Sequence, residues 1–200
     1  AGRKITIEQK FYGEVMETSE RSGVKHYSPN FHLASPTHHQ ILFVGGDGSY
    51  KCEDEAILTA FQAGPNFLTR TRLDYVKAGA SVTVFCAPSD RYGGKWLYKS
   101  FSKPNYRTSN EFLTDLKSLI GQLKAKFDIP VWLNGTSAGS YAAVFGATNL
   151  PELVDGVVIS SIVTETSSVM PEAIEEIGLL ELSQPLLVMM HSEDECKATP

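Results

Sequence analysis

The sequence predicts an α/β fold: a mainly parallel, twisted sheet with helices on both faces and antiparallel edge strands at the N-terminus. Short apolar runs, each of the length of one buried strand, alternate with segments of helical periodicity. That alternation is typical of parallel sheets in which a helix connects successive strands. The 200 residues, 42% hydrophobic and 20% charged, suit a single domain over 1–200.

The strands follow from two kinds of pattern. In residues 1–35, Ile5 and Ile7 alternate with polar residues, and extended pieces are broken at Ser22-Gly23 and at Pro29, which predicts one or two antiparallel edge strands. Later apolar runs predict buried strands at 41–44, 81–87, 129–133, 154–162 and 186–190.

The helices follow from periodicity and from end signals. Residues 66–78 predict a helix that Gly79 ends. Thr108 and Glu111 have the spacing of a capping box, and apolar residues recur at helical spacing as far as Phe127. Residues 141–145 predict a helix rich in small residues, and a short helix is predicted at 171–177.

One stretch of the chain carries a chemical motif. The strand at 129–133 leads into Gly135-Thr136-Ser137-Ala138-Gly139, and a helix follows. Strand, G-x-S-x-G and helix together predict a nucleophile elbow, with Ser137 raised above the sheet and the Ala138 N–H at a helix N-terminus, where negative charge is stabilised. The alternative is a glycine-rich turn with an incidental serine.

A second glycine-rich loop follows the strand at 41–44. Residues 45–49 read Gly-Gly-Asp-Gly-Ser, so backbone N–H groups, from Gly46 or Asp47, are expected to supply a second oxyanion donor. A plain glycine turn is the alternative. A phosphate site is less favoured, because neither a G-x-G-x-x-G fingerprint nor a Walker lysine is in place.

Composition limits the partners. The net charge of −5 and a pI near 5.5 give no reason to expect nucleic acid, and no apolar run reaches the roughly 18 residues of a membrane span. The segment 91–107 has five cations and five aromatics, and is interpreted as a solvated loop. The alternatives are a flap that favours anionic substrates and a single-stranded nucleic-acid site.

The cysteines are three: Cys52, Cys86 and Cys196. An odd number leaves at least one without a partner in this chain. Cys86 lies in an apolar strand and is expected to act as a small hydrophobe. Compartment is left open between an exported or periplasmic location and a cytoplasmic one.

The order of these motifs resembles the α/β-hydrolase fold, and is similar to a group of bacterial α/β-hydrolases with a G-T-S-x-G-S elbow. The matching pieces are 45–49, 66–72, 87–90, 134–140 and 191–196. The resemblance implies Ser137 as nucleophile, Asp194 as the acid, and Ala138 with Gly46 or Asp47 as oxyanion donors, with no cofactor and no metal. Other acids on expected strand-end loops are Glu193, Glu195, Glu165 and Asp90.

The resemblance also implies a histidine after the acid, and none follows position 191. It therefore implies a chain incomplete at its C-terminus, or a companion segment or chain, with Cys196 pairing to a cysteine there. His191 is the alternative base. His38 and His39 should lie at the opposite edge of the sheet, and as adjacent histidines without further ligands they are weak evidence for a metal.

The expected function is a serine hydrolase that acts on a small-molecule carboxylic ester through an acyl-enzyme. A non-catalytic binding protein of the same fold and an acyltransferase are the alternatives. Lack of a final strand and helix would leave an apolar seam, which should drive association, for instance into a homo-oligomer.

Overall fold

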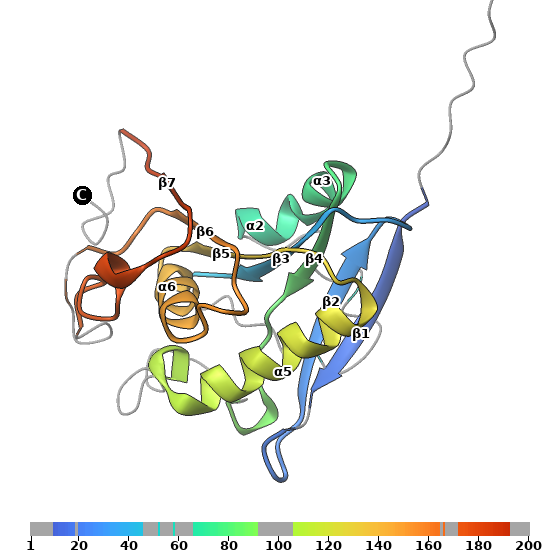
Figure 1. Ribbon diagram of the computed structural model, residues 1–200, viewed down its shortest axis with the longest axis horizontal. Helices are drawn as coiled ribbons and strands as arrows, with labels where there is room; N and C mark the ends of the chain where they lie inside the picture. Colours follow the sequence, from blue (N-terminus) through green and yellow to red (C-terminus); the bar gives the residue numbers. More distant parts are fainter. Residues whose placement is uncertain are drawn as a thin grey trace, which may run out of the picture.

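The computed structural model describes residues 10–18, 20–45, 52, 58, 66–91, 106–164, 166 and 172–192. In these parts of the chain, strands form one sheet in the order β1-β2-β4-β3-β5-β6-β7 (Figure 1). The strands are β1 (Tyr12–Thr18), β2 (His26–His32), β3 (His38–Phe43), β4 (Ala80–Val84), β5 (Val131–Thr136), β6 (Gly156–Ser160) and β7 (Leu186–Met189). β3 is the central strand, with β4, β2 and β1 on one side and β5, β6 and β7 on the other.

The directions of the strands confirm the predicted mainly parallel sheet. β3 pairs in parallel with both β4 and β5, and β6 and β7 continue the parallel series. β1 and β2 form an antiparallel hairpin, which joins β4 in antiparallel sense. The carboxyl ends of the five parallel strands therefore lie at one edge, where ligand sites form in open α/β sheets.

The hairpin differs from the sequence prediction in one detail. The turn lies at Ser22-Gly23 as predicted, where Gly23 has a φ of 73°, but Pro29 lies inside β2 instead of breaking it. Pro29 is opposite Val15 of β1, while the register with β4 uses only Asn30 and Phe31. Pro29 therefore does not pair with β4, where its lack of an N–H would cost a hydrogen bond. Ile5 and Ile7 lie outside the described residues.

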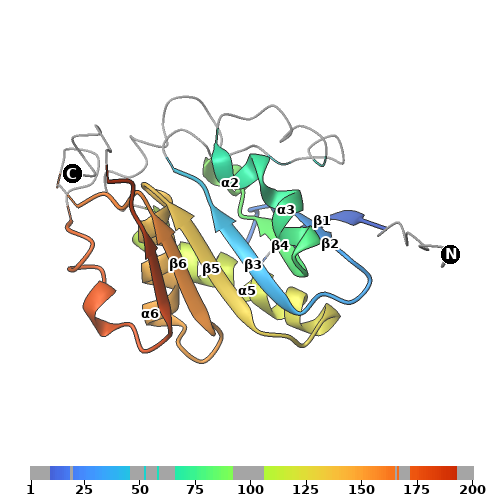
Figure 2. The same cartoon turned by 90° about the horizontal axis from the view of Figure 1, so that it is seen from above.

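Helices cover both faces of the sheet, as predicted. α5 (Asn110–Lys126) and α6 (Gly139–Asn149) lie on one face, and α2 (Phe67–Arg70) with α3 (Arg72–Lys77) on the other (Figures 1 and 2). Alternate residues of β3 explain why: Ile41 and Phe43 belong to the core under α5 and α6, whereas Leu42 belongs to the core under α2 and α3. A strand buried on both sides is continuously apolar.

Three helix predictions need correction. The predicted capping residue Thr108 is wrong, because Ser109 is the N-cap and its Oγ accepts from the Phe112 N–H at 3.2 Å. The predicted helix at 66–78 is divided at Thr71, whose hydroxyl donates to the Phe67 carbonyl at 2.8 Å. The predicted helix at 171–177 is wrong over its described part: residues 174–178 form turns, and Gly178, with a φ of 110°, precedes the 3-10 helix η4 (Leu179–Glu181).

Candidate active site

Ser137 occupies the turn between β5 and α6, at the carboxyl edge of the sheet. Its φ is 52°, in the left-handed region that few residues other than glycine adopt. Its carbonyl accepts the Ser140 N–H at 2.9 Å, which closes the turn into the first residues of α6. The chain thus changes from strand to helix within two residues, at the cost of an unfavourable backbone conformation.

Three glycines make this turn possible. A Cβ at Gly135 would lie 2.4 Å from the Gly139 carbonyl oxygen, and one at Gly139 would lie 2.0 Å from the carbonyl oxygen of Phe43. A Cβ at Gly45 would lie 2.7 Å from the Ser137 Cβ. Only backbone fits at these positions, so the ends of β3 and β5 and the start of α6 are in direct contact around the serine.

The contact between Gly45 and Ser137 was not expected from the sequence, which indicates only a glycine loop after β3. The two residues are far apart in the chain. They meet because β3 and β5 are neighbours in the sheet, with Phe43 opposite Gly135. The signal was present in the sequence as a glycine directly after a buried strand, but its partner depends on strand order.

The next strand supports the serine from its other side. The Ser137 N–H donates to the Ser160 carbonyl at the end of β6, at 2.9 Å. Ser161 follows with a φ of 44°, so two neighbouring strand ends carry a residue other than glycine in the left-handed region. Such conformations cluster where a fold holds a functional site.

The serine is the accessible point of this buried turn. Ser137 is partly exposed, while the residues from Leu133 to Thr136 and from Ala138 to Ser140 are buried. No hydrogen bond between described residues is donated by the Ala138 N–H, which lies next to the first turn of α6. An unpaired N–H at a helix N-terminus is suited to bind a negatively charged oxygen.

Tyr141, in the first turn of α6, ties the chain that follows β6 to this helix. Its hydroxyl donates to the Glu172 carbonyl at 3.0 Å and lies 3.4 Å from the Val163 carbonyl. Burial, with help from the negative charges of nearby glutamates, raises the pKa of Tyr141 to about 12. The group is therefore a hydrogen-bond donor at neutral pH and not a base.

The histidines of β2 and β3 contact groups other than Ser137. His26 is buried, with its Nδ1 2.9 Å from the Thr18 hydroxyl and its Nε2 2.8 Å from the Cys86 carbonyl. His32 contacts the Leu33 carbonyl, and His39 contacts the Phe127 carbonyl. His38 and His39 begin β3, so they lie at the edge opposite Ser137, as expected. His191 follows β7 at the carboxyl edge and is exposed.

The acids expected from the sequence fall into two groups. Glu165, Glu193, Asp194 and Glu195 lie outside the described residues, as do Gly46 and Asp47 of the glycine loop and Cys196. Asp90, the remaining acid, is described, and it is paired with Arg21 at 2.7 Å. A carboxylate held by a guanidinium in this way is a structural group, not an acid free to orient a histidine.

Asp90 belongs to a charge network that the sequence did not indicate. Arg21, from the β1–β2 turn, bridges Asp90 and the buried Asp115 of α5, and the Tyr106 hydroxyl donates to Asp115 at 2.7 Å. Burial raises the pKa of Tyr106, and the nearby Asp115 raises it further. The network joins the hairpin, α5 and the loop after β4, which no local pattern reveals.

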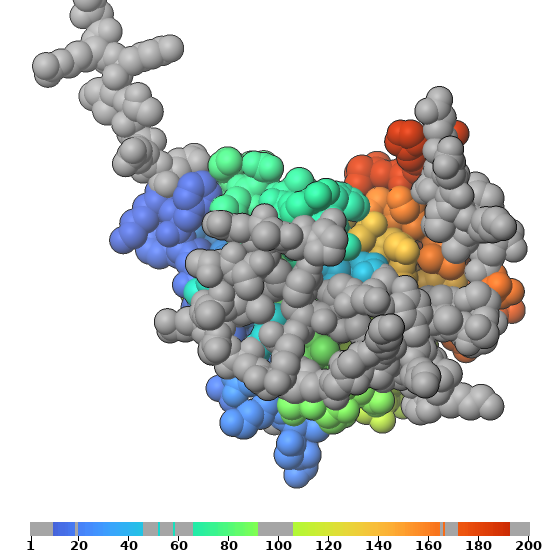
Figure 3. All heavy atoms as spheres, turned by 180° about the vertical axis from the view of Figure 1, so that it is seen from behind, coloured from blue at the N-terminus to red at the C-terminus, as the bar shows by residue number. Residues whose placement is uncertain are grey.

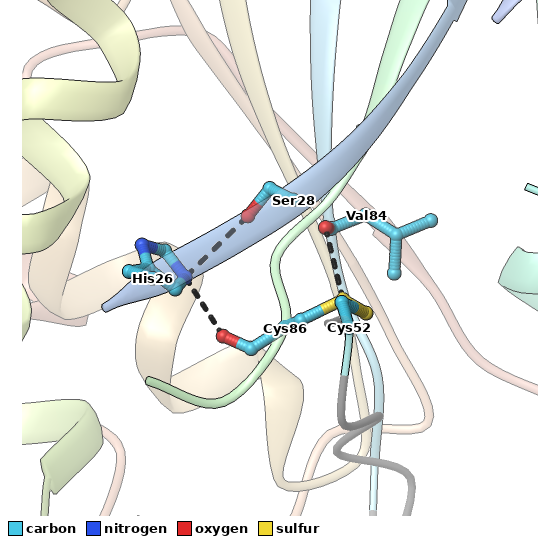
Figure 4. Close-up of a disulfide and its surroundings, with 5 residues drawn as sticks. All are labelled: His26, Ser28, Cys52, Val84 and Cys86. Atoms are coloured by element: carbon cyan, nitrogen blue, oxygen red, sulfur yellow. Dashed lines mark hydrogen bonds between the residues drawn. A yellow bond between two sulfur atoms is a disulfide. The ribbon is translucent and has the colours of Figure 1, made fainter. Parts of the chain in front are cut away.

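A disulfide joins Cys52 to Cys86, so the expectation that Cys86 acts as a free small hydrophobe is wrong (Figure 4). Both cysteines are buried and 34 residues apart in the chain. Cys86 does lie among apolar residues, but apolar surroundings do not distinguish a free thiol from a half-cystine. The bond fixes a residue that follows the glycine loop to the chain just after β4, near the buried ring of His26.

The described residues contain no group of three or more His, Cys, Asp and Glu side chains that could hold a metal ion. None of the helices in the described parts of the chain is long and apolar enough to cross a membrane.

Comparison with known proteins places the fold. No family model matches the sequence, and no curated protein matches it. Among solved structures, S-formylglutathione hydrolase from Staphylococcus aureus is similar over 96% of this chain and 82% of its own, at 11% identity and a TM-score of 0.62. An esterase from Pyrococcus furiosus is similar over 89% of this chain and 70% of its own, at 15% identity and a TM-score of 0.56.

Larger enzymes match as well. A prolyl endopeptidase is similar over 95% of this chain, at 14% identity and a TM-score of 0.60, and brefeldin A esterase, a bacterial homologue of human hormone-sensitive lipase, over 81%, at 13% identity and a TM-score of 0.52. The chain spans 31% and 43% of the length of these two proteins. At such identities the likeness establishes the fold alone.

Proposed function

We propose that this chain, which has the α/β-hydrolase fold, is a serine hydrolase. It would cleave a carboxylic ester, or a related acyl compound, through an acyl-enzyme on Ser137. The observation that carries the proposal is the conformation of this one residue. Ser137 has a φ of 52° and is partly exposed in a turn whose other residues are buried. A strained serine between a central strand and a helix is the arrangement of a nucleophile elbow.

The packing of the turn supports a catalytic serine over an incidental one. A left-handed conformation disfavours a side chain by about 1–2 kcal/mol. A serine without a function at this position could therefore be replaced by glycine with no loss of stability. Here the surrounding backbone is packed so closely that Gly45, Gly135 and Gly139 admit no Cβ, yet Ser137 keeps its side chain and some exposure. Strain of this kind is retained where function requires it.

The oxyanion donors follow from the same geometry. The Ala138 N–H adjoins the N-terminus of α6, where the helix dipole favours negative charge. Gly45 packs against Ser137, and the next residues of its loop, Gly46 and Asp47, are proposed to supply the second N–H. Two such donors stabilise the tetrahedral intermediate of acyl transfer.

The proposed reaction has two halves. A base accepts the hydroxyl proton of Ser137 while the Ser137 Oγ attacks the acyl carbon, and the leaving alcohol departs with that proton. Water then attacks the acyl-enzyme through the same base and releases the acid. Asp194 is proposed to orient the base, which is His191 or a histidine from a C-terminal companion segment or chain. No step requires a cofactor.

A second candidate function is a protein of this fold that binds an acyl compound without turning it over. The observation that favours it is that His26, His32 and His39 each bond to a backbone carbonyl away from the serine. An acyltransferase uses the same residues as the hydrolase, with an alcohol or amine in place of water.

The test is hydrolysis of short-chain nitrophenyl esters by the protein and by Ser137→Ala. The variant should lose turnover and still fold, because alanine tolerates the turn as serine does. Ser118→Ala is the matched control, since Ser118 lies on α5, where its hydroxyl contacts Glu20. Product analysis with added alcohol separates hydrolysis from acyl transfer. Full esterase activity in Ser137→Ala would refute the proposal.

A further inference from the structure

Ser161 directly follows β6 and lies beside the candidate nucleophile. The Ser137 N–H donates to the Ser160 carbonyl at 2.9 Å, so by covalent geometry the Cα of Ser161 lies within about 6 Å of the Ser137 nitrogen. The Ser161 N–H donates in turn to the Met189 carbonyl at the end of β7, at 3.1 Å. In Figure 3, yellow and orange atoms from the part of the chain that holds β5 and β6 lie side by side at the molecular surface. The two hydrogen bonds therefore hold Ser161 at the carboxyl edge of the sheet, next to Ser137.

The backbone of Ser161 turns the chain at the end of the strand. Its φ of 44° lies in the left-handed region, which disfavours a side chain. The next two residues, Ile162 and Val163, are buried in the same core as Tyr141, whereas Ser161 is partly exposed. The turn thus returns the chain to the core and leaves Ser161 as the residue that solvent can reach. Glycine would make the same turn without strain, so a serine here indicates that a side chain is required.

Tyr141 holds the chain after this turn against α6. It lies in the first turn of the helix, and its side chain is buried. Its hydroxyl donates to the Glu172 carbonyl at 3.0 Å and lies 3.4 Å from the Val163 carbonyl, so one buried group is shared by two points of the chain that follows β6. Burial raises the pKa of Tyr141 to about 12, and the hydroxyl therefore remains a donor at neutral pH.

These contacts close a ring of bonds on one side of the serine. The ring runs from Ser137 along the first turn of α6 to Tyr141, and through the Tyr141 hydroxyl to the Val163 carbonyl. It then runs back along the chain to Ser160, whose carbonyl accepts the Ser137 N–H. Ser161 is part of this ring. Its position relative to Ser137 therefore depends on the hydroxyl of Tyr141.

We propose that Ser161 limits the size of the acyl group that the site accepts, and that Tyr141 is a positioning residue that holds Ser161 in place. The inference rests on the proposed function, because it assigns one wall of the site to the acyl-enzyme on Ser137. The acyl group stays bonded to the Ser137 Oγ in both halves of the reaction, whereas the alcohol leaves after the first. A fixed neighbour of Ser137 should therefore discriminate among acyl groups and favour short ones.

The test measures kcat/KM for nitrophenyl octanoate relative to nitrophenyl acetate, with the protein taken together with any C-terminal companion segment or chain. Ser161→Gly removes the side chain, so this ratio should rise at least about fivefold. Ser161→Asn enlarges the side chain, and asparagine tolerates the left-handed conformation, so the ratio should fall at least about fivefold. Acetate esters of short and long alcohols should show no such change, because their acyl group is the same.

Tyr141→Phe tests the positioning role, because it removes the hydroxyl and keeps the buried ring. The octanoate-to-acetate ratio should rise at least about threefold, and the change should appear in KM for the octanoate more than in kcat. Tyr75→Phe is the matched control, since Tyr75 lies on α3, on the other face of the sheet, and loses the same atom. There the ratio should change by less than about 1.5-fold. A purely structural Tyr141 would lower the midpoint of thermal unfolding and leave the ratio unchanged.

Three results would overturn the proposal. The first is a ratio that neither Ser161 variant changes, and these two variants carry the test if Tyr141→Phe fails to fold. The second is a change confined to the esters of different alcohols. The third is an unchanged ratio in folded Tyr141→Phe.

Failure of the proposed function is distinguishable from these results by the reaction of Ser137 with a fluorophosphonate. An adduct on Ser137, together with unchanged ratios in the variants, refutes the roles of Ser161 and Tyr141 alone. A folded wild-type protein with neither an adduct on Ser137 nor ester hydrolysis refutes the proposed function, and the roles of Ser161 and Tyr141 with it.

Discussion

At the scale of single residues, the backbone of Ser137 connects stability with function. Its φ of 52° is unfavourable for any side chain. Glycine relieves that strain, whereas alanine keeps it. The free energy of unfolding of Ser137→Gly should therefore be about 1 kcal/mol higher than that of Ser137→Ala, and both variants should lack esterase activity. Urea unfolding of the two variants measures the difference. Equal stability would show that the turn is not strained.

At the same scale, substitutions of two helical glycines are expected to change stability in opposite directions. Gly139→Ala places a Cβ 2.0 Å from the Phe43 carbonyl oxygen, so β3 and α6 must separate. We expect a loss of about 2–4 kcal/mol in the free energy of unfolding. Gly121→Ala, on α5, meets nothing within 4 Å and should gain about 0.5–1 kcal/mol. Thermal unfolding of both variants tests the close packing around Ser137, and similar effects would contradict it.

At the scale of elements, one charge network connects the β1–β2 hairpin, α5 and the loop after β4. Burial by itself raises the pKa of Asp90, but hydrogen bonding and charge attraction from Arg21 outweigh it and leave the pKa below its ordinary value. A carboxylate with a lowered pKa in the fold stabilises the protein above its unfolded pKa. That stabilisation is lost as the pH falls through the folded pKa.

The prediction is that Asp90→Asn lowers the free energy of unfolding at neutral pH and makes its fall on acidification shallower. Burial lowers the pKa of His26, so this residue adds a second loss of stability on acidification. That loss begins below the unfolded pKa of about 6.5 and is expected in Asp90→Asn as well. Asp74→Asn is the control, because Asp74 forms an exposed pair with Lys77. Unfolding in urea at several pH values measures all three proteins. Parallel curves for wild type and Asp90→Asn would contradict the account.

At the scale of the whole molecule, the parallel sheet could be predicted because each buried strand is an apolar run with its own turn signals. The order of strands could not, since the contact of Gly45 with Ser137 depends on β3 and β5 being neighbours. The Cys52–Cys86 bond and the Arg21 network escaped prediction for the same reason. The motif at 135–139 was visible because its requirements are local, whereas the roles of Gly46, Asp47 and Asp194 stay predictions.

Strand β7 shows what an apolar run predicts and what it does not. Leu187 and Val188 are apolar enough for a central strand but are 52% and 44% exposed at the edge. A run of apolar residues predicts a strand, while its neighbours decide whether it is covered. Whether this surface drives association of the chain stays a prediction.

The most direct test of the central claim is the reaction of the protein with a fluorophosphonate, followed by intact-mass analysis and peptide mapping. This reagent modifies a serine efficiently only where a base activates it. We predict one adduct, on Ser137, that is absent from Ser137→Ala and present in Ser118→Ala. A folded protein, tested together with any C-terminal companion segment or chain, that gains no adduct or gains it on another serine would contradict the assignment of Ser137 as the nucleophile.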